Sequence, residues 1–226
     1  MPPSRPSART QGGLAAVLAL IAGYVDSYGF LNYRVYASFM SGDTTQTGLQ
    51  AGQRRLAEAG HNLLPIPLFV IGVFLGTLIT HSGLRHPLRW LLALVAALLI
   101  IDMGAVYLGA ADWLSIAILS LAMGMMNSAL SRVGGQSISL GYVTGGLNNV
   151  GRHLALAVKR APLADAQGQS DTHGRRAALL AGIWLAFVVG ALLAGAATPS
   201  FAVRTLLAPT LVLLALAASI RFPLAD

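Results

Sequence analysis

The chain of 226 residues contains no cysteine, and charged residues make up only 10% of it. The lack of cysteine excludes disulfide bonds, thiolate chemistry and cysteine-based metal sites. A water-soluble domain usually carries about 25% charged residues, so the scarcity of charge argues against an ordinary soluble protein. Hydrophobic residues make up 55% of the chain, and its mean hydropathy is +0.68. This composition is typical of a protein embedded in a membrane.

Motifs of the common enzyme classes are also missing. The strings HExxH, GxSxG, GxGxxG and GxxxxGK[ST] do not occur, although they mark metalloproteases, serine hydrolases and nucleotide-binding enzymes. The five histidines are not spaced as metal ligands are. We therefore expect no enzyme activity, no catalytic residue, no metal site and no cofactor.

Basic residues outnumber acidic ones, which gives a formal net charge of +7 and an isoelectric point near 10.6. In a soluble protein this excess would suggest nucleic acid as a partner. Here the basic residues lie at the ends of apolar segments, most densely at Arg54, Arg55 and between Lys159 and Arg176. Cytoplasmic loops of membrane proteins carry such an excess. The expected partner is the lipid bilayer rather than nucleic acid.

Six apolar segments predict membrane-spanning helices. Each is close to the roughly 20 residues that an α-helix needs to cross about 30 Å of hydrocarbon. The first segment follows two arginines, as in a signal peptide, but five further spans follow it and it carries Asp26, so we expect it to be retained. The sequence thus predicts an all-α, polytopic transmembrane bundle with a disordered tail over residues 1–12. The segments are residues 13–31, 63–80, 90–108, 113–130, 177–196 and 205–220.

Paired stretches of sequence predict an internal duplication. "GYVDSYGFL" from Gly23 resembles "GMMNSALSR" from Gly124, and "MSGDTTQTG" from Met40 resembles "VTGGLNNVG" from Val143. "FVIG" with "FVVG", and then "RWLLA" with "RTLLA", continue the match in the same order. We therefore expect two membrane repeats, residues 13–108 and 109–226, the second with a longer polar loop over residues 159–176.

The polar motif of each repeat leaves two topologies open. If both motifs cross the membrane fully, the chain has eight spans and the repeats are parallel. If both are re-entrant or broken, it has six crossings and the second repeat is inverted. We favour six firm spans plus two shorter or broken motif helices, because the motifs are too polar to face lipid. Both topologies place the two termini on the cytoplasmic side.

The two motifs also predict a polar site between the repeats. A helix that begins after Gly42, or after Gly145 and Gly146, would point free N–H groups at a ligand, with Ser41 or Thr144 as its cap. Many secondary transporters bind substrates in this way. The alternative is that these side chains only hydrogen-bond between helices, at about 0.6 kcal/mol each. The expected pathway consists of Asp26, Ser41, Gly42, Asp43, Thr44, Thr45, Gln46, Asn127, Thr144, Gly145, Gly146, Asn148 and Asn149.

Asp26 and Asp102 both lie inside apolar segments, where a charged side chain costs roughly 2.5 to 3.5 kcal/mol on insertion scales. Asp26 has small residues on its helical face, so a neighbour or a cavity can approach it. Asp102 has no polar neighbour before Tyr107, and we expect it to be protonated or bonded to its own helix. Arg34 is expected to neutralise Asp26 or Asp43 as an ion pair.

Small residues recur at a spacing that favours helix packing. Gly72 and Gly76 form a GxxxG pair, and Gly190 with Ala194 forms the corresponding pair in the second repeat. Such pairs allow two helices to approach closely. They predict contacts either within one chain or between two copies in a homodimer.

Four of these stretches together resemble one family. "AGYVDSYGFL", "SFMSGDTTQTG", "LAMGMMNSAL" and "YVTGGLNNVG" are similar to motifs of the YoaK family of bacterial membrane proteins, which is classed as a domain of unknown function. The resemblance runs from Ala22 through nearly all of the chain. It implies a multi-pass protein of the bacterial inner membrane, of a kind commonly described as a transporter. Where the family has a Thr-Gly-Asn type motif, this chain reads Ser41-Gly42-Asp43, which adds an acid.

Two functions are hypotheses at this point. The first is a small secondary transporter or permease with a polar site between the repeats, acting on an unidentified small solute or ion. The second is a membrane scaffold or assembly protein without transport activity. Because 226 residues are few for enclosing a pathway, we expect a homodimer.

Overall fold

The computed structural model describes residues 8–129, 132–133, 136–137, 143–163, 165–166 and 171–220. These residues are mainly helical, with one pair of antiparallel two-residue strands that the sequence did not predict, β1 (Arg132–Val133) and β2 (Gln136–Ser137). The helices are α1 (Ala8–Tyr33), α2 (Met40–Gly52), α3 (Leu56–Leu63), α4 (Pro65–Thr80), α5 (Pro87–Tyr107), α6 (Asp112–Asn127), α7 (Val143–Val158), α8 (His173–Phe201), the 3-10 helix η1 (Ala202–Leu206) and α9 (Leu207–Ser219).

Helices occupy all six of the apolar segments that the sequence marks. Four helical stretches of the described residues are long and apolar enough to cross a membrane. The last of them is 47 residues long and contains α8, η1 and α9, while α6 is a shorter apolar helix. The four stretches are Thr10–Tyr33, Leu56–Thr80, Pro87–Tyr107 and His173–Ser219.

Two predicted boundaries differ from the observed ones. α1 begins at Ala8, inside the predicted tail, because no proline interrupts the chain after residue 6; residues 1–7 lie outside the described part. α8 begins at His173, inside the predicted loop. The Thr172 hydroxyl accepts a hydrogen bond from the Arg175 N–H (3.2 Å), which caps the helix there.

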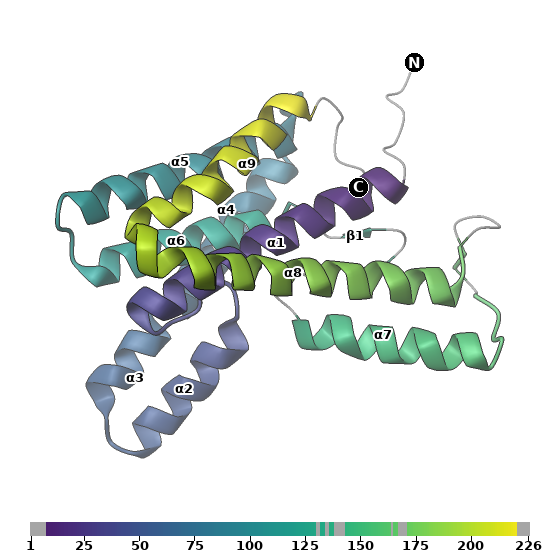
Figure 1. The fold of residues 1–226 in the computed structure, drawn as a ribbon, viewed down its shortest axis with the longest axis horizontal. Helices are drawn as coiled ribbons and strands as arrows, with labels where there is room; N and C mark the ends of the chain where they lie inside the picture. Colours follow the sequence, from purple (N-terminus) through teal and green to yellow (C-terminus); the bar gives the residue numbers. More distant parts are fainter. Residues whose placement is uncertain are drawn as a thin grey trace.

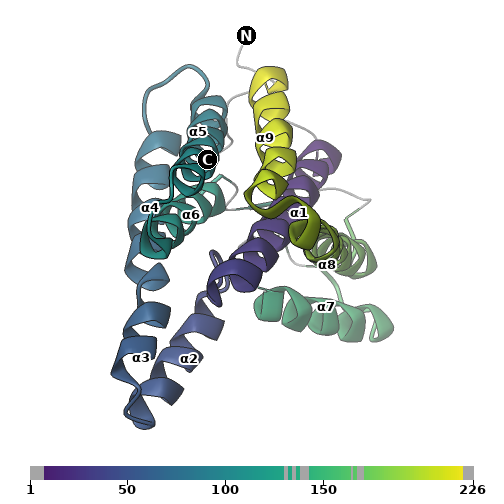
Figure 2. The ribbon, with the colours of Figure 1, turned by 60° about the vertical axis from the view of Figure 1, so that its left-hand side comes forward.

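The long helices pack in pairs whose members are far apart in the sequence. α1 lies against α8, α4 lies against α6, and α5 lies beside α9, an arrangement that Figures 1 and 2 show from two sides. α1 and α8 run in the same direction, because Gly12 faces Leu179 and Gly23 faces Phe187. The core between the pairs is built largely from buried side chains of α1, α5 and α6.

Glycines allow α1 and α8 to reach backbone contact. A Cβ atom on Gly23 would overlap the carbonyl oxygen of Phe187, and a Cβ atom on Gly190 would overlap that of Leu20. Ala194, one turn after Gly190, is fully buried. Small residues at a crossing let the two backbones approach, which increases the van der Waals contact that holds helices together in lipid.

The α4–α6 pair repeats these contacts. A Cβ atom on Gly124 would overlap the carbonyl oxygen of Phe69, and a Cβ atom on Gly72 would overlap that of Leu121. Gly76 lies against Ser128 one turn further along, so α4 and α6 also run in the same direction. Both predicted small-residue pairs are therefore used for packing inside one chain.

Two helical arms extend from the bundle, as Figure 2 shows most clearly for the first. In this arm α2 packs along α3, which continues into α4 after Leu64. The buried Asn62 amide donates to Gln50 Oε1 (2.8 Å) and to the Glu58 carbonyl (3.0 Å), which joins the two helices. In the second arm α7 packs along α8.

We expect Gly190→Ala to lower stability and Gly182→Ala to leave it unchanged or raise it. The new Cβ at position 190 would force α1 away from α8, and over-packing of this kind costs about 1–3 kcal/mol. Gly182 lies on the same helix but is exposed, and a Cβ atom added there would meet no atom within 4 Å, while alanine favours helix. Thermal unfolding midpoints in one detergent compare the two variants. Equal midpoints would contradict the backbone contact.

Candidate functional site

The motif segments are helical from their first residues, which corrects the predicted breaks. α2 runs through Ser41 and Gly42, and its N-cap is Phe39. α7 runs through Thr144 and Gly145. Ser41 and Thr144 are therefore second residues of helices rather than caps. In the first half, the loop of residues 34–39 separates α1 from α2. Gly42 lies in the first turn of α2 and does not interrupt that helix.

α2 and α7 do not pack along each other, and the predicted pocket between their first turns stays a prediction. Each motif helix finds its partner in the next helix of its own half, α2 on α3 and α7 on α8, and the two lie in separate arms (Figures 1 and 2). Ser41, Thr44, Thr45, Gln46, Thr144 and Asn148 are exposed, whereas Gly42, Asn127, Gly145, Gly146 and Asn149 are partly buried.

Threonine hydroxyls of α2 are bonded to their own helix. Thr44 Oγ1 donates to the Met40 carbonyl (2.7 Å), and Thr45 Oγ1 donates to the Ser41 carbonyl (2.9 Å). A hydroxyl that bonds the carbonyl four residues earlier is satisfied without any ligand. These two side chains therefore explain how a polar segment forms an exposed helix without a ligand.

Asp26 is the centre of the polar contacts in the first half. Its side chain is buried on α1, 3% exposed. The Ser38 N–H donates to Asp26 Oδ1 (2.6 Å), and the Ser38 hydroxyl donates to Oδ2 (2.8 Å). Both oxygens of the carboxylate thus hold the loop of residues 34–39 against α1. Hydrogen bonds to an ionised acceptor are roughly twice as strong as neutral ones.

Asp43 holds the same loop from the other side. It is fully buried, and the Tyr36 N–H donates to its two carboxylate oxygens (3.1 and 3.3 Å). Burial raises the pKa of Asp43 to about 7, against the hydrogen bond from Tyr36, and the nearby Asp26 raises it further. The sequence marked both acids as pathway residues, and the structure brings them to one loop.

Arg34 does not pair with either acid. It is exposed, it adopts a left-handed backbone conformation (φ 58°), and its guanidinium lies 5.7 Å from the centre of the Phe30 ring. An exposed arginine keeps its hydration and a cation–π contact there. The predicted ion pair is wrong because the loop turns the side chain outward.

Asp102 lies deeper than the sequence suggested. It is fully buried on α5, and neither of its carboxylate oxygens has a hydrogen-bond partner among the described residues. Of the two predicted states, the acid bonded to its own helix is therefore not observed.

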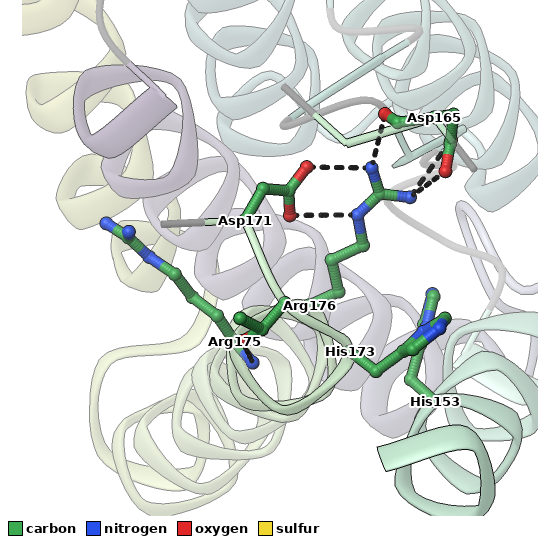
Figure 3. A network of polar contacts seen from close by, with 7 residues as sticks. His153, Asp165, Asp171, His173, Arg175 and Arg176 are labelled. Atoms are coloured by element: carbon green, nitrogen blue, oxygen red, sulfur yellow. Dashed lines mark hydrogen bonds and ion pairs between the residues drawn. The ribbon is translucent and has the colours of Figure 1, made fainter. Parts of the chain in front are cut away.

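The sequence missed a polar network at the start of α8, shown in Figure 3. Arg176 is 3% exposed. Asp171 accepts from its Nε (3.0 Å) and its second terminal nitrogen (2.8 Å), and Asp165 accepts from its first terminal nitrogen (3.0 Å). The two acids neutralise the buried guanidinium, which hydrogen-bonds the loop to the helix. Two acids and an arginine within one polar loop are the only sequence signal for it.

His153 and His173 join α7 to α8 beside this network. Their Nδ1 atoms are 2.8 Å apart, so one nitrogen donates and the other accepts, and both rings are buried. Burial lowers the pKa of His153, and its neighbours His173, Arg176 and Arg152 lower it further, against Asp165. His153 therefore favours the neutral imidazole, which fits a structural contact between the two helices.

A known family covers nearly all of the helices described above. The family described as "Protein of unknown function (DUF1275)" matches residues 14–219, from α1 to α9. The chain belongs to this family. The resemblance expected from the motifs is thereby confirmed.

One relative of this DUF1275 chain is a UPF0700 transmembrane protein of Rhizobium meliloti (strain 1021). The two are 30% identical over 148 residues, which are 65% of this chain and 63% of the relative. The match thus spans less than two thirds of the relative's length. It supports a multi-pass membrane protein. No solved structure matches the chain.

We expect Asp43→Asn to remove a pH dependence of stability. The raised pKa of Asp43 means that the folded protein holds this proton up to about pH 7, whereas the unfolded chain releases it near pH 4. The stability that the neutral acid contributes is therefore full below pH ~4 and is lost as the pH rises to about 7. Asparagine keeps an acceptor for Tyr36 and has no charge to bury.

The measurement is the thermal unfolding midpoint in detergent on both sides of this window. The variant should match the wild type at the acidic end and exceed it at the alkaline end. Glu58→Gln, at an exposed salt-bridged carboxylate in the same arm, should follow the wild type. A parallel decline of Asp43→Asn and wild type would refute the role of Asp43.

Proposed function

We propose that the chain is a small secondary transporter built from two inverted repeats, acting on a small solute or ion. The observation that carries the proposal is the matched pair of glycine crossings. Gly23 and Gly124 hold equivalent positions in the two repeats, and so do Phe69 and Phe187. Gly23 packs against the Phe187 carbonyl of the second repeat, and Gly124 packs against the Phe69 carbonyl of the first. Such an exchange is expected when two copies of one unit are related by a two-fold axis, as in many secondary transporters.

Helix directions support the inversion. Tyr33, the last residue of α1, has its carbonyl 2.8 Å from His61 Nε2, just before α4 begins, so α4 runs back along the direction of α1. α6 runs with α4 and hence against α1, its counterpart in the first repeat. The six crossings are then α1, α3 together with α4, α5, α6, α8 and α9. The two shorter motif helices are α2 and α7.

Charge supports the orientation of the termini and does not discriminate six spans from eight. Of the 15 lysines and arginines, six crossings leave only Arg34, Arg54, Arg55 and Arg204 on the side opposite to the termini. Cytoplasmic loops carry the excess of basic residues. We therefore assign both termini to the cytoplasmic side of a bacterial inner membrane.

Buried acids supply the chemistry of a pathway. Asp26 and Asp102 lie in helices long and apolar enough to span, where acids are costly and commonly belong to ion or proton pathways. We therefore centre the proposed pathway on the side of α1. There Asp26 and Asp43 converge on the backbone of the loop of residues 34–39.

A scaffold or assembly protein is the second candidate. The exposed polar residues of α2 and α7 lie in arms outside the bundle, where they are available to another protein. In that case the buried acids serve only to fix the loop between α1 and α2.

Single cysteines test the topology, because the chain has none of its own. With six crossings, Gln53→Cys at the tip of the first arm should react with a membrane-impermeant maleimide added outside intact cells. Ser82→Cys, between α4 and α5, should react only after the membrane is opened. Eight full spans would reverse both results and overturn the inverted arrangement.

Transport is tested with the purified protein in liposomes and a panel of ions and small metabolites. We expect uptake above that of empty liposomes. Asp26→Asn should lose most of this uptake per molecule, because acids inside membrane-spanning helices commonly belong to ion or proton pathways. Glu58→Gln, at an exposed carboxylate outside the predicted pathway, is the matched control and should transport normally. Wild-type uptake no higher than that of empty liposomes supports the scaffold instead, whereas a lower protein level with unchanged uptake per molecule assigns Asp26 a structural role only.

A further inference from the structure

A second group of buried polar side chains lies where α1, α5 and α6 meet. Tyr28 and Tyr33 come from α1, Asp102 from α5 and Ser115 from α6, and their exposed fractions are 1%, 8%, 0% and 1%. The tyrosine rings meet edge to face, with centroids 6.1 Å apart. α5 packs on α6 and α6 contacts α1, which places the Asp102 carboxyl within electrostatic range of both tyrosines and of Ser115. Nothing in the sequence places these four residues together.

The oxygens of this cluster lack full hydrogen bonding. Within the described part of the chain, Asp102 Oδ1, Asp102 Oδ2 and Ser115 Oγ are buried and have no partner inside hydrogen-bonding geometry. An unpaired carboxylate in such surroundings costs several kcal/mol by desolvation. The acid therefore either holds a proton or binds a cation.

The neighbouring elements offer no cation to pair with Asp102. α4 and α9 contain no titratable residue, and Arg204 of η1 is exposed. Asp112, at the exposed start of α6, faces Tyr33 and is itself an acid. No group of three or more metal-ligating side chains occurs in the described residues. One carboxyl among three hydroxyls is also a poor match for Ca²⁺ or Mg²⁺, which prefer several carboxylates and carbonyls.

We propose that Asp102, with Ser115, Tyr28 and Tyr33, forms a proton-binding site, and that this proton is the coupling ion of the transporter. The use of the proton for coupling rests on the proposed function; its binding does not. Tyr33 ends α1 beside His61, and Asp102 lies five residues before the end of α5, about 8 Å along the helix axis. The hydroxyls thus connect the acid to the membrane face that carries the first arm.

Proton occupancy is tested on the full chain in lipid with dicyclohexylcarbodiimide, which reacts with protonated carboxyl groups in apolar surroundings. Mass spectrometry should find the label on Asp102, several-fold less of it at alkaline pH, and none on the exposed Glu58. Added Na⁺ at constant pH should not change labelling. Protection by Na⁺, or an unlabelled Asp102, overturns the proposal.

Infrared spectra give a second measurement that does not depend on reagent access. The wild type should show the carbonyl band of a protonated carboxyl that Asp102→Asn lacks and that Glu58→Gln keeps. If Asp102→Asn does not fold, Asp102→Leu takes its place, since it removes the acid without a new polar group. Identical spectra for wild type and variant overturn proton binding.

Coupling is tested in liposomes with an imposed pH gradient and the same panel of solutes. Asp102→Asn should lose accumulation driven by the gradient by about tenfold or more while keeping exchange of solute. Uptake by the variant that still follows the gradient overturns the coupling role. If the wild type moves no solute, the proposed function fails, and the labelling and infrared results decide proton binding separately.

Discussion

Backbone contact between helices at four glycines is the constraint on which the rest of this structure depends. In lipid, apolar side chains gain little by leaving the solvent, so helices associate through close packing and polar contacts. Gly23 and Gly190 bring α1 onto α8, and Gly72 and Gly124 bring α4 onto α6. α5 and α9 then pack together beside these pairs. Each arm contains a helix that is held in the bundle by one of these glycine contacts: α3 continues into α4 in the first arm, and α7 packs along α8 in the second.

The sequence predicts the parts of the fold that depend on local pattern. Apolar length located the apolar helices, and the spacing of Gly72, Gly76, Gly190 and Ala194 located close packing. The family followed from the motifs. All of these features depend on residues that are close together in the sequence, so composition and helical spacing are enough to predict them.

Features that depend on tertiary contacts could not be predicted in this way. Gly42 was taken as a helix break, but the loop before it supplies the break. Arg34 was expected to pair with an acid, yet the loop turns it outward over Phe30. Asp26 and Asp43, far apart in the apolar and polar stretches, bond the same loop, and α7 packs along α8 rather than along α2. Asp102 lies near Ser115 and Tyr28 only because α5, α6 and α1 pack together. The spacing of these three residues in the sequence does not predict that arrangement.

The two halves of the proposed duplication share their packing and differ in their acids. Asp26 corresponds to Asn127, and Asp43 corresponds to Gly146. Glycine contacts are thus kept in both halves, whereas the buried acids among the described residues belong to the first. A bundle with matched packing and unmatched charge has one side suited to ion chemistry and one side that serves as its structural counterpart.

The exchanged pairing of helices also affects how the protein is made. α1 leaves the ribosome long before α8, its main partner, because α8 begins only at His173. The glycine surface of α1 must therefore remain in the bilayer without its partner while most of the chain is synthesised. Insertion of the first half and its final assembly are separate events, and the assembly waits for the last third of the polypeptide.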